Sequence, residues 1–441
     1  MFAITLRRRF VLLNEVKNLV ELSLKGLRFF GLGLRMTLRY SFIVGEIQVE
    51  KMRGVCHQVK MGLCYTHKSR INLNNREAKA SDFVWYNSFA MNIQKFVRPY
   101  IRSLSAYNAK EIPCKVKLDA NESPYGFKKA LKAAGSLETN RYPDPEAQSL
   151  KKALSKYVEA RPDSILQGNG SDEMIYYLIT TFGGPVLYPT PTFSMYGIIT
   201  QALGERRIEI PLDNEFDLDM KSMLRAISKE KPKLIFLSSP NNPTGNCFSS
   251  EKILKIIAST SSRSLVVVDE AYQPFSSKKG FVPLLKDYKN LVIMKTLSKI
   301  GLAGLRVGFL VADKEIINEV NKVRLPFNLN SFSQAIAIGV MKDKKSLQAN
   351  VNAIVYERDK LFSELRKMNG LTPYPSEANF ILFRVADSET VYKGLLNRGI
   401  LVRNMKGVVN SCLRVTIGTP EENRFFINTL KKIIKENQQE K

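Results

Sequence analysis

The chain has 441 residues, which is long enough for more than one domain, each with its own hydrophobic core. Its hydrophobic fraction of 44% and charged fraction of 24% are typical of globular proteins, and no apolar run approaches the roughly 18 residues of a membrane span. The formal net charge is +26, but no nucleic-acid-binding module is recognisable, so we expect neither a nucleic-acid nor a membrane partner.

Residues 1–90 differ in composition from the rest of the chain. They hold fifteen Lys and Arg against six Asp and Glu, and they show no sustained core periodicity. Three interpretations stay open: an organellar transit segment, an appended segment, or sequence upstream of a wrongly chosen start, with Met91 as the true first residue. We favour the last, and we expect this segment to be poorly ordered.

From Met91 onward, strand and helix patterns alternate. Residues 91–145 are expected to form an arm and part of a smaller domain, and they precede an amphipathic helix expected at residues 146–158. Continuous runs of Val, Ile and Leu then predict strands buried on both faces, at residues 185–188, 234–237, 265–268, 291–294 and 307–311. This alternation predicts an α/β domain at residues 146–345, in which helices cover both faces of a mostly parallel sheet.

A second, smaller α+β domain is expected at residues 346–441. A long helix is predicted at about residues 333–367, before the break at Gly370. The patterns that follow have the order β-α-β-β-α, with strands at 378–383, 400–402 and 413–417 and helices near 395 and at 421–435.

The usage of histidine and cysteine excludes several kinds of catalytic site. Both histidines, His57 and His67, precede Met91, so no Ser-His-Asp triad or His-ligated metal can form in the body of the chain. The five cysteines are odd in number and lack a Cys-x-x-Cys pair, which fits a reducing cytosol better than a disulfide framework or a zinc site. We therefore expect a cytoplasmic protein without a metal site, whose acid–base chemistry uses Lys, Tyr, Asp, Glu or a cofactor.

Two segments carry functional signals of their own. Asp269 closes the strand at 265–268, which places its carboxylate at the sheet edge where open α/β folds bind ligands; it equally fits a cap of a strand-to-loop turn. Gly168-Asn169-Gly170-Ser171-Asp172 precedes a helical run and offers free backbone N–H groups to an anion. N-capping by Ser171 or Asp172 explains the same pattern.

Three phrases together resemble the pyridoxal-phosphate (PLP) site of the aspartate-aminotransferase superfamily. They are Ser239-Pro240-Asn241-Asn242-Pro243-Thr244-Gly245, Asp269-Glu270-Ala271-Tyr272, and Lys295-Thr296-Leu297-Ser298-Lys299 with the following Ile300-Gly301-Leu302-Ala303-Gly304-Leu305-Arg306. The resemblance runs from about Pro113 to Leu430 and is greatest to the histidinol-phosphate aminotransferase family. It implies the fold-type-I PLP transferase fold, with a seven-stranded sheet in the large domain.

The resemblance implies a role for each matching residue around the cofactor ring. Lys299 corresponds to the lysine that forms the Schiff base and carries the proton, and Asp269 to the partner of the ring nitrogen. Asn242 and Tyr272 correspond to the hydrogen-bond donors to the phenolate oxygen. Phe193 matches an aromatic residue stacked on the ring, although a role in the core is equally open.

The implied contacts to the cofactor phosphate come from two segments of one subunit and from a loop of its neighbour. Within one subunit they are Gly170, Ser171, Asp172, Thr296, Ser298 and Arg306. Tyr142 resembles the tyrosine that reaches the phosphate of the neighbouring subunit, which implies an obligate homodimer. The spacer between Lys299 and Arg306 is one residue shorter than in the commoner sequences of the family. The position of Arg306 therefore depends on a tighter turn.

Substrate recognition is implied for the small domain and the arm. Arg414 matches the superfamily arginine that binds a substrate carboxylate, and Arg403 matches a second arginine suited to a phosphate-bearing amine. Either could instead be a surface arginine at a strand end. Asn121, Glu122 and Tyr125 in the arm are further candidates for pocket residues.

The function implied is that of a PLP-dependent transaminase of histidine biosynthesis. Such an enzyme converts L-histidinol phosphate and 2-oxoglutarate into imidazole-acetol phosphate and L-glutamate. An aromatic aminotransferase and a threonine-phosphate decarboxylase of the same fold are alternatives. A PLP-dependent transcriptional regulator is disfavoured, because no winged helix-turn-helix pattern precedes Met91.

Overall fold

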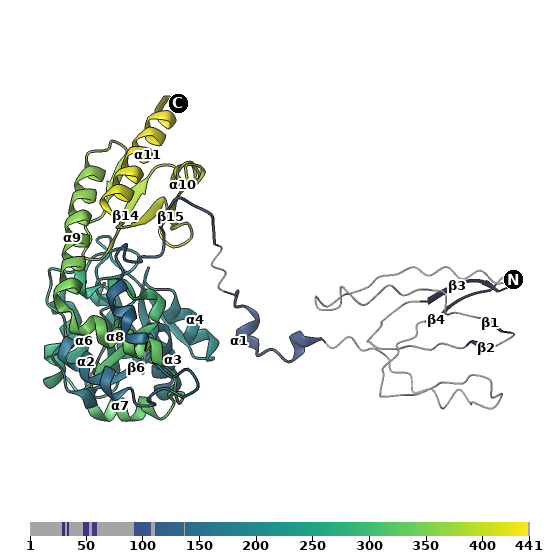
Figure 1. Ribbon diagram of the computed structural model, residues 1–441, viewed down its shortest axis with the longest axis horizontal. Coiled ribbons are helices and arrows are strands. Elements are labelled where there is room, and N and C mark those ends of the chain that lie inside the picture. Colours follow the sequence, from purple (N-terminus) through teal and green to yellow (C-terminus); the bar gives the residue numbers. More distant parts are fainter. Residues whose placement is uncertain are drawn as a thin grey trace. The chain divides into compact units, whose positions relative to one another are not determined.

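The structure is a computed structural model that describes residues 92–106, 111–135 and 137–439, together with the backbone of four short strands before residue 60. It divides into two units, Met1–Arg98 and Pro99–Lys441 (Figure 1). In the first unit two antiparallel strand pairs form, β1 (Phe29–Phe30) with β2 (Gly33–Leu34) and β3 (Ile47–Met52) with β4 (Val55–Val59). Apart from these strands, the prediction that residues 1–90 are poorly ordered lies outside the described residues.

A seven-stranded sheet forms the centre of the second unit, with the strand order β6-β12-β11-β10-β9-β7-β8. The strands are β6 (Ile165–Asn169), β7 (Val186–Thr190), β8 (Arg207–Pro211), β9 (Leu234–Ser238), β10 (Leu265–Asp269), β11 (Leu291–Thr296) and β12 (Val307–Ala312). β12 runs antiparallel to β11 and β6, and the other pairings are parallel. The predicted mostly parallel sheet is confirmed, and all five strands predicted for it form.

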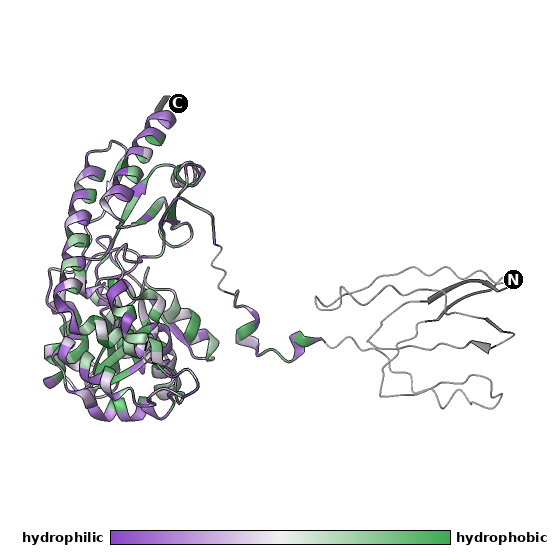
Figure 2. Ribbon diagram, viewed as in Figure 1, coloured by the Kyte–Doolittle hydropathy of each residue, from purple (hydrophilic) through white to green (hydrophobic). Residues whose placement is uncertain are grey.

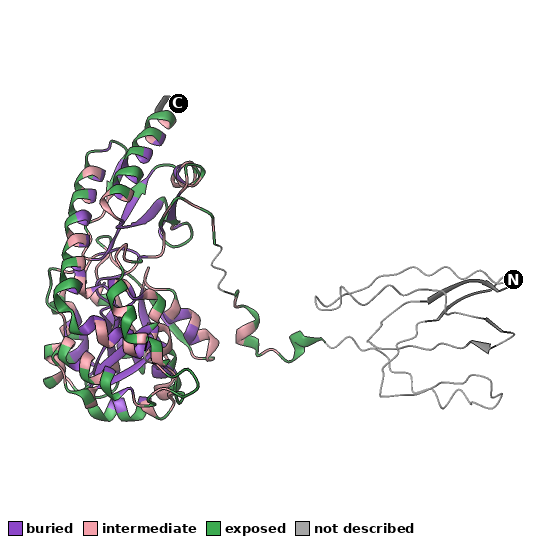
Figure 3. Ribbon diagram, in the orientation of Figure 1, coloured by how far each residue is buried: buried purple, intermediate pink, exposed green. Residues whose placement is uncertain are grey.

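Helices cover both faces of this sheet, because successive strand residues point to opposite sides. Val266 and Val268 belong to one hydrophobic cluster and Val267 to another. The first cluster is completed by α2 (Gln148–Val158), α5 (Met220–Glu230), α6 (Ser250–Ser259) and α8 (Ser331–Lys342), and the second by α3 (Gly170–Phe182), α4 (Met195–Ala202) and α7 (Lys314–Asn321). The strands are hydrophobic in Figure 2 and buried in Figure 3, whereas the covering helices show one polar, exposed side.

The prediction of one long helix at residues 333–367 is wrong in one respect, because two helices form in this range. α8 ends before Asp343, and α9 (Lys344–Arg366) begins after it. Asp343 leaves the helical conformation, with φ −95° and ψ 60°, and its carboxylate accepts a hydrogen bond from the backbone N–H of Ser346 at 3.1 Å. This N-cap starts a new helix, and apolar periodicity alone does not reveal it.

A five-stranded sheet has the order β13-β14-β16-β15-β5. Its strands are β5 (Val116–Leu118), β13 (Leu371–Pro373), β14 (Phe380–Val385), β15 (Ile400–Asn404) and β16 (Cys412–Thr416), and the helices α10 (Ser388–Asn397) and α11 (Pro420–Gln439) follow the predicted order. β5 comes from the arm and pairs in parallel with β15. The domain boundaries proposed at residues 145 and 345 stay a prediction.

Short helical turns connect these elements. They are α1 (Pro99–Arg102) and the 3₁₀ turns η3 (Ile93–Lys95), η4 (Lys128–Ala134), η5 (Pro162–Ser164), η6 (Gln273–Phe275), η7 (Val282–Lys286), η8 (Ser298–Ile300) and η9 (Ala303–Leu305). None of the helices in the described part of the chain has the length and hydrophobicity required to cross a membrane.

Candidate active site

Asp269 lies at the carboxyl ends of the parallel strands, as the last residue of β10. It is 3% exposed, and this burial raises the pKa of its carboxyl group to about 6. Its Oδ2 accepts a hydrogen bond from Tyr196 Oη at 2.6 Å, and its Oδ1 accepts one from the backbone N–H of Ala271 at 3.0 Å. A cation placed beside this carboxylate would offset the cost of its burial.

The contact between Tyr196 and Asp269 was not predicted from the sequence. Tyr196 is fully buried in α4 and stacks on Phe236, with ring centroids 4.9 Å apart and an interplanar angle of 18°. Phe193 is half-buried and meets Tyr196 edge-on at 5.7 Å. Only the packing of α4 against the sheet reveals this contact, since Tyr196 and Asp269 are 73 positions apart in the chain.

Lys299 lies in η8, directly after β11, which is the neighbour of β10 in the sheet. Its Nζ donates a hydrogen bond to the carbonyl oxygen of Ala120 at 3.3 Å and lies 5.8 Å from the ring centroid of Tyr272. Tyr272 Oη in turn accepts a hydrogen bond from Asn121 Nδ2 at 3.0 Å. The structure thus brings together three residues that the resemblance places at the cofactor or the substrate: Lys299, Tyr272 and Asn121.

Arg414 connects the five-stranded sheet with the turn after β9. Its Nη1 donates a short hydrogen bond to Asn242 Oδ1, and its Nη2 donates one to the carbonyl oxygen of Asp119 at 2.7 Å. Arg403 lies directly opposite Arg414 in the antiparallel pair of β15 and β16, so the two side chains are on the same face of the sheet. Arg414 is 8% exposed, whereas Arg403 is exposed, so the two predicted arginines differ in their access to solvent.

The arm residues Glu122 and Tyr125 lie near the segment 298–305, which contains η8 and η9 and is called the Lys299 turn below. Glu122 is exposed and forms an ion pair with Lys117 at 2.7 Å. Tyr125 is half-buried, and a Cβ at Gly301 would approach its carbonyl oxygen to 2.5 Å. Beside this contact lies a cavity of about 280 Å³, lined by residues of the arm, of the Lys299 turn and of the segment after β16. Lys299, Asp269, Tyr272 and Arg414 do not line this cavity, so it lies beside the residues predicted to hold the cofactor.

The predicted phosphate-binding residues meet where α3 begins. Gly170 has φ 76°, and a Cβ there would lie 2.6 Å from Nη2 of Arg306. A Cβ at Gly308 would overlap the backbone of Gly170, so both positions require glycine. Ser171 and Asp172 lie in the first turn of α3, where backbone N–H groups and the helix dipole favour an anion.

The short spacer between Lys299 and Arg306 does not displace the arginine. Two consecutive 3₁₀ turns, η8 and η9, form over residues 298–305 and accommodate the shorter spacer. Arg306 itself adopts a left-handed conformation with φ 53°. Its Nη1 then donates to Ser298 Oγ at 3.4 Å, and its Nη2 lies 3.5 Å from Asp172 Oδ2. Thr296 Oγ1 forms a further hydrogen bond with Ser298 Oγ at 3.0 Å.

These residues fit the chemical groups of PLP. Hydroxyl groups, a guanidinium group and a helix N-terminus meet at one end of the site, which suits a phosphate. The buried Asp269 ends β10, the strand next to β11, and its carboxylate suits a cationic ring nitrogen. The amine of Lys299 lies near Tyr272.

Tyr142 is the residue predicted to act at the phosphate of the neighbouring subunit. It is 81% exposed, and its ring stacks on Phe327 with centroids 4.6 Å apart and an interplanar angle of 21°. A tyrosine that reaches a neighbouring subunit must be accessible in this way, but its contact with the neighbour's phosphate stays a prediction.

A buried ion pair lies next to the site, and the sequence did not indicate it. Lys295 Nζ lies 2.5 Å from Glu270 Oε2, and the two side chains are 9% and 0% exposed. Glu270 follows β10 and Lys295 belongs to β11, so the pair joins the two strands that carry Asp269 and Lys299. A buried charge of this kind depends strongly on its partner.

The family model for class I and II aminotransferases matches residues 113–430. The histidinol-phosphate aminotransferase of Caldanaerobacter subterraneus subsp. tengcongensis is 40% identical over 353 residues, which cover 78% of this chain and 99% of the relative. That of Aquifex aeolicus is 41% identical over 348 residues, which cover 76% of this chain and 97% of the relative. The chain therefore belongs to the class I and II aminotransferases and, within them, to the histidinol-phosphate aminotransferase family.

A solved structure extends the comparison to the fold. Histidinol-phosphate aminotransferase from Sinorhizobium meliloti in complex with pyridoxal-5'-phosphate has a TM-score of 0.68 and 24% sequence identity, with 77% of this chain and 98% of that chain covered. The fold-type-I prediction is thereby confirmed. The family model and the curated relatives show that the chain is a transaminase.

Proposed function

We propose that this transaminase uses PLP to transfer the amino group of L-histidinol phosphate to 2-oxoglutarate, as a cytoplasmic homodimer in histidine biosynthesis. The main support is the convergence of Lys299, Asp269 and Tyr272 at the edge of the sheet, with Arg414 reaching the same region from the second sheet. The names of the relatives, which share about two residues in five with this chain, support the choice of substrate.

PLP supplies a carbonyl carbon that reacts with amines and an aromatic ring that accepts electrons. In the proposed site Lys299 Nζ would hold the cofactor and would be the base that accepts and returns a proton, which fits a body without histidine. Asp269, held by Tyr196 and the backbone of Ala271, keeps a negative charge at the ring nitrogen. Asn242 and Tyr272 bind the phenolate oxygen, and Phe193 packs against the ring.

The remaining residues orient the two anionic groups. Gly170, Ser171, Asp172, Thr296, Ser298 and Arg306 surround the cofactor phosphate, with Tyr142 contributed by the neighbouring subunit. Arg414 binds the carboxylate of glutamate or 2-oxoglutarate, because its planar fork forms two parallel hydrogen bonds to such a group. The exposed Arg403 on the same face binds the substrate phosphate. Asn121 and Tyr125 contact the substrate from the arm.

The test incubates the purified protein with PLP, L-histidinol phosphate and 2-oxoglutarate, and measures glutamate formation together with the cofactor absorbance. We expect glutamate formation to depend on both substrates and to be abolished in Lys299→Ala. Carbon dioxide release from threonine phosphate, or a higher kcat/KM with aromatic amino acids, would replace this function with one of the two alternatives.

A further inference from the structure

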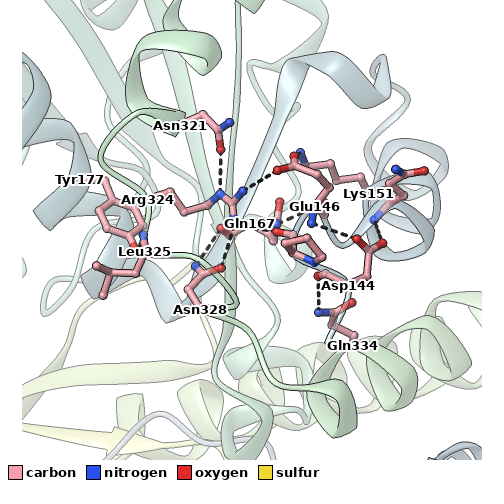
Figure 4. Close-up of polar contacts among 12 residues, drawn as sticks. Asp144, Glu146, Lys151, Gln167, Tyr177, Asn321, Arg324, Leu325, Asn328 and Gln334 are labelled. Atoms are coloured by element: carbon pink, nitrogen blue, oxygen red, sulfur yellow. Dashed lines mark hydrogen bonds and ion pairs between the residues drawn. The ribbon is translucent and has the colours of Figure 1, made fainter. Parts of the chain in front are cut away.

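The loop that carries Tyr142 is held in place from its C-terminal side by Arg324 (Figure 4). Arg324 follows α7, and its side chain is 6% exposed. Its Nη1 donates a hydrogen bond to the carbonyl oxygen of Pro145 at 2.7 Å, and its Nη2 pairs with Glu146 Oε1 at 2.9 Å. One guanidinium group thus holds two consecutive residues, three and four positions after Tyr142.

Gln334 adds a second attachment to the same loop. Its Nε2 donates a hydrogen bond to the carbonyl oxygen of Asp144 at 3.2 Å. The Asp144 carboxylate accepts hydrogen bonds from the backbone N–H groups of Glu146 at 3.0 Å and Gln148 at 2.8 Å. The loop is therefore fixed both to α8 and to the first turn of α2, and little backbone freedom remains between Asp144 and Gln148.

The segment that holds the loop also contacts the ring of Tyr142. Phe327, which stacks on Tyr142, lies three residues after Arg324. Arg324 Nη1 also donates to Asn328 Oδ1 at 3.3 Å, and its Nε donates to Asn321 Oδ1 at 2.7 Å. Residues 321–328 therefore determine both the backbone path of the loop and the direction of its exposed aromatic ring.

The same segment is bonded to the N-terminus of α3, where the predicted phosphate site of its own subunit lies. Asn328 Nδ2 donates to Glu173 Oε2 at 2.8 Å, and that oxygen also accepts a hydrogen bond from the backbone N–H of Asn169 at 2.7 Å. Asn169 Nδ2 forms a short hydrogen bond to the carbonyl oxygen of Asn328. Because Asn169 directly precedes Gly170, the loop with Tyr142 and the start of α3 share one hydrogen-bond network.

We propose that Arg324 is a positioning residue, which holds Tyr142 in the orientation required at the phosphate site of the partner subunit. The inference rests on the proposed role of Tyr142 in a homodimer. Tyr142 is 81% exposed, and its ring stacks on Phe327. Its orientation therefore follows from the path of the loop, which Arg324 holds at Pro145 and Glu146.

The test is a double-mutant cycle on the affinity for PLP. PLP is removed from the full-length holoenzyme and titrated back while its absorbance is followed, for the wild type, Tyr142→Phe, Arg324→Ala and the double variant. We expect each single variant to bind PLP about tenfold more weakly, because a hydrogen bond to a charged phosphate is lost in both. The double variant should bind PLP no more weakly than Tyr142→Phe alone.

Two further variants keep the test decisive. Glu146→Gln weakens the ion pair with Arg324 at a side chain that is 46% exposed, so the fold should tolerate it. Introduced into the wild type, this substitution should lower the affinity for PLP; introduced into Tyr142→Phe, it should not lower the affinity further. The matched control is Arg161→Ala, which removes an arginine whose side chain is 79% exposed and pairs with Asp163. This control should leave PLP affinity unchanged.

Several outcomes would overturn the proposal. Losses of affinity that multiply in the double variant would show that Arg324 acts independently of Tyr142, as a purely structural residue would. A loss in Tyr142→Phe without one in Arg324→Ala and Glu146→Gln would refute the role of Arg324 and leave that of Tyr142 intact. Unchanged affinity in Tyr142→Phe would refute both roles. A protein that binds PLP as expected but forms no glutamate would refute the proposed function alone.

Discussion

Replacing Asp269 with asparagine should stabilise the cofactor-free protein above about pH 6, although it should abolish catalysis. Burial raises the pKa of Asp269 from 3.8 to about 6 in the folded protein. Between these two values the folded state keeps a proton that the unfolded state has lost, so the free energy of unfolding falls as the pH rises through this window. Above it, the ionised carboxylate costs about 3 kcal/mol, at about 1.4 kcal/mol for each pKa unit.

Asparagine keeps the shape of the side chain but carries no charge to bury. Its Oδ1 can accept the hydrogen bond from the backbone N–H of Ala271, while its Nδ2 donates one to Tyr196 Oη. Urea unfolding of the cofactor-free wild type and Asp269→Asn at about pH 4.5 and about pH 7.5 measures the difference. The stability of the wild type relative to the variant should decrease by about 2 kcal/mol between these two conditions. Glu215→Gln, at an exposed carboxylate, should follow the wild type.

A stability difference between the wild type and Asp269→Asn that does not change with pH would refute this reasoning. It would mean that Asp269 has the same pKa in the folded and unfolded protein, and that burial at the end of β10 does not affect its charge. Addition of PLP should stabilise the wild type more than the variant, because only the wild type offers a carboxylate to a cationic ring nitrogen.

Three further predictions concern the residues around the site. Lys295→Met should destabilise the protein by about 3–5 kcal/mol in urea unfolding, because it leaves the Glu270 carboxylate buried without its partner. Adding Glu270→Gln to Lys295→Met should recover much of that loss of stability. Arg414→Lys should lower kcat/KM for 2-oxoglutarate about tenfold or more, because lysine cannot form two parallel hydrogen bonds to a carboxylate; equal kcat/KM values would contradict this role. Gly170→Ala should cost about 1–3 kcal/mol of stability and weaken PLP binding, since its Cβ would displace Arg306.

The large sheet could be predicted wherever its strands are apolar on both faces. β9, β10 and β11 are buried almost throughout, so their continuous runs of Val, Ile and Leu stand out in the sequence. β8 lies at the edge of the sheet and alternates buried with exposed residues, and β6 contains Gln167, Gly168 and Asn169. Neither strand has a continuous apolar run, and neither was predicted.

The candidate site could be predicted where its residues stand next to each other in the chain. Asp269 and Tyr272 share one phrase, and Ser298, Lys299 and Arg306 share another, so their common environment follows from local sequence. The contact between Asn121 and Tyr272 spans 151 positions, and only folding brings the arm to the edge of the sheet. The resemblance suggested that Asn121 lines a pocket but did not identify this partner.

The sequence by itself determined the kinds of chemistry available to this protein: an amine, a buried carboxylate and an anion-binding helix start, with no histidine in the body of the chain. The tertiary structure alone decided which side chains support that chemistry. Tyr196 beside Asp269, Lys295 against Glu270 and Arg324 against Glu146 are separated by 73, 25 and 178 positions, respectively. Such pairs leave no local pattern, because their geometry depends on how distant strands and helices pack.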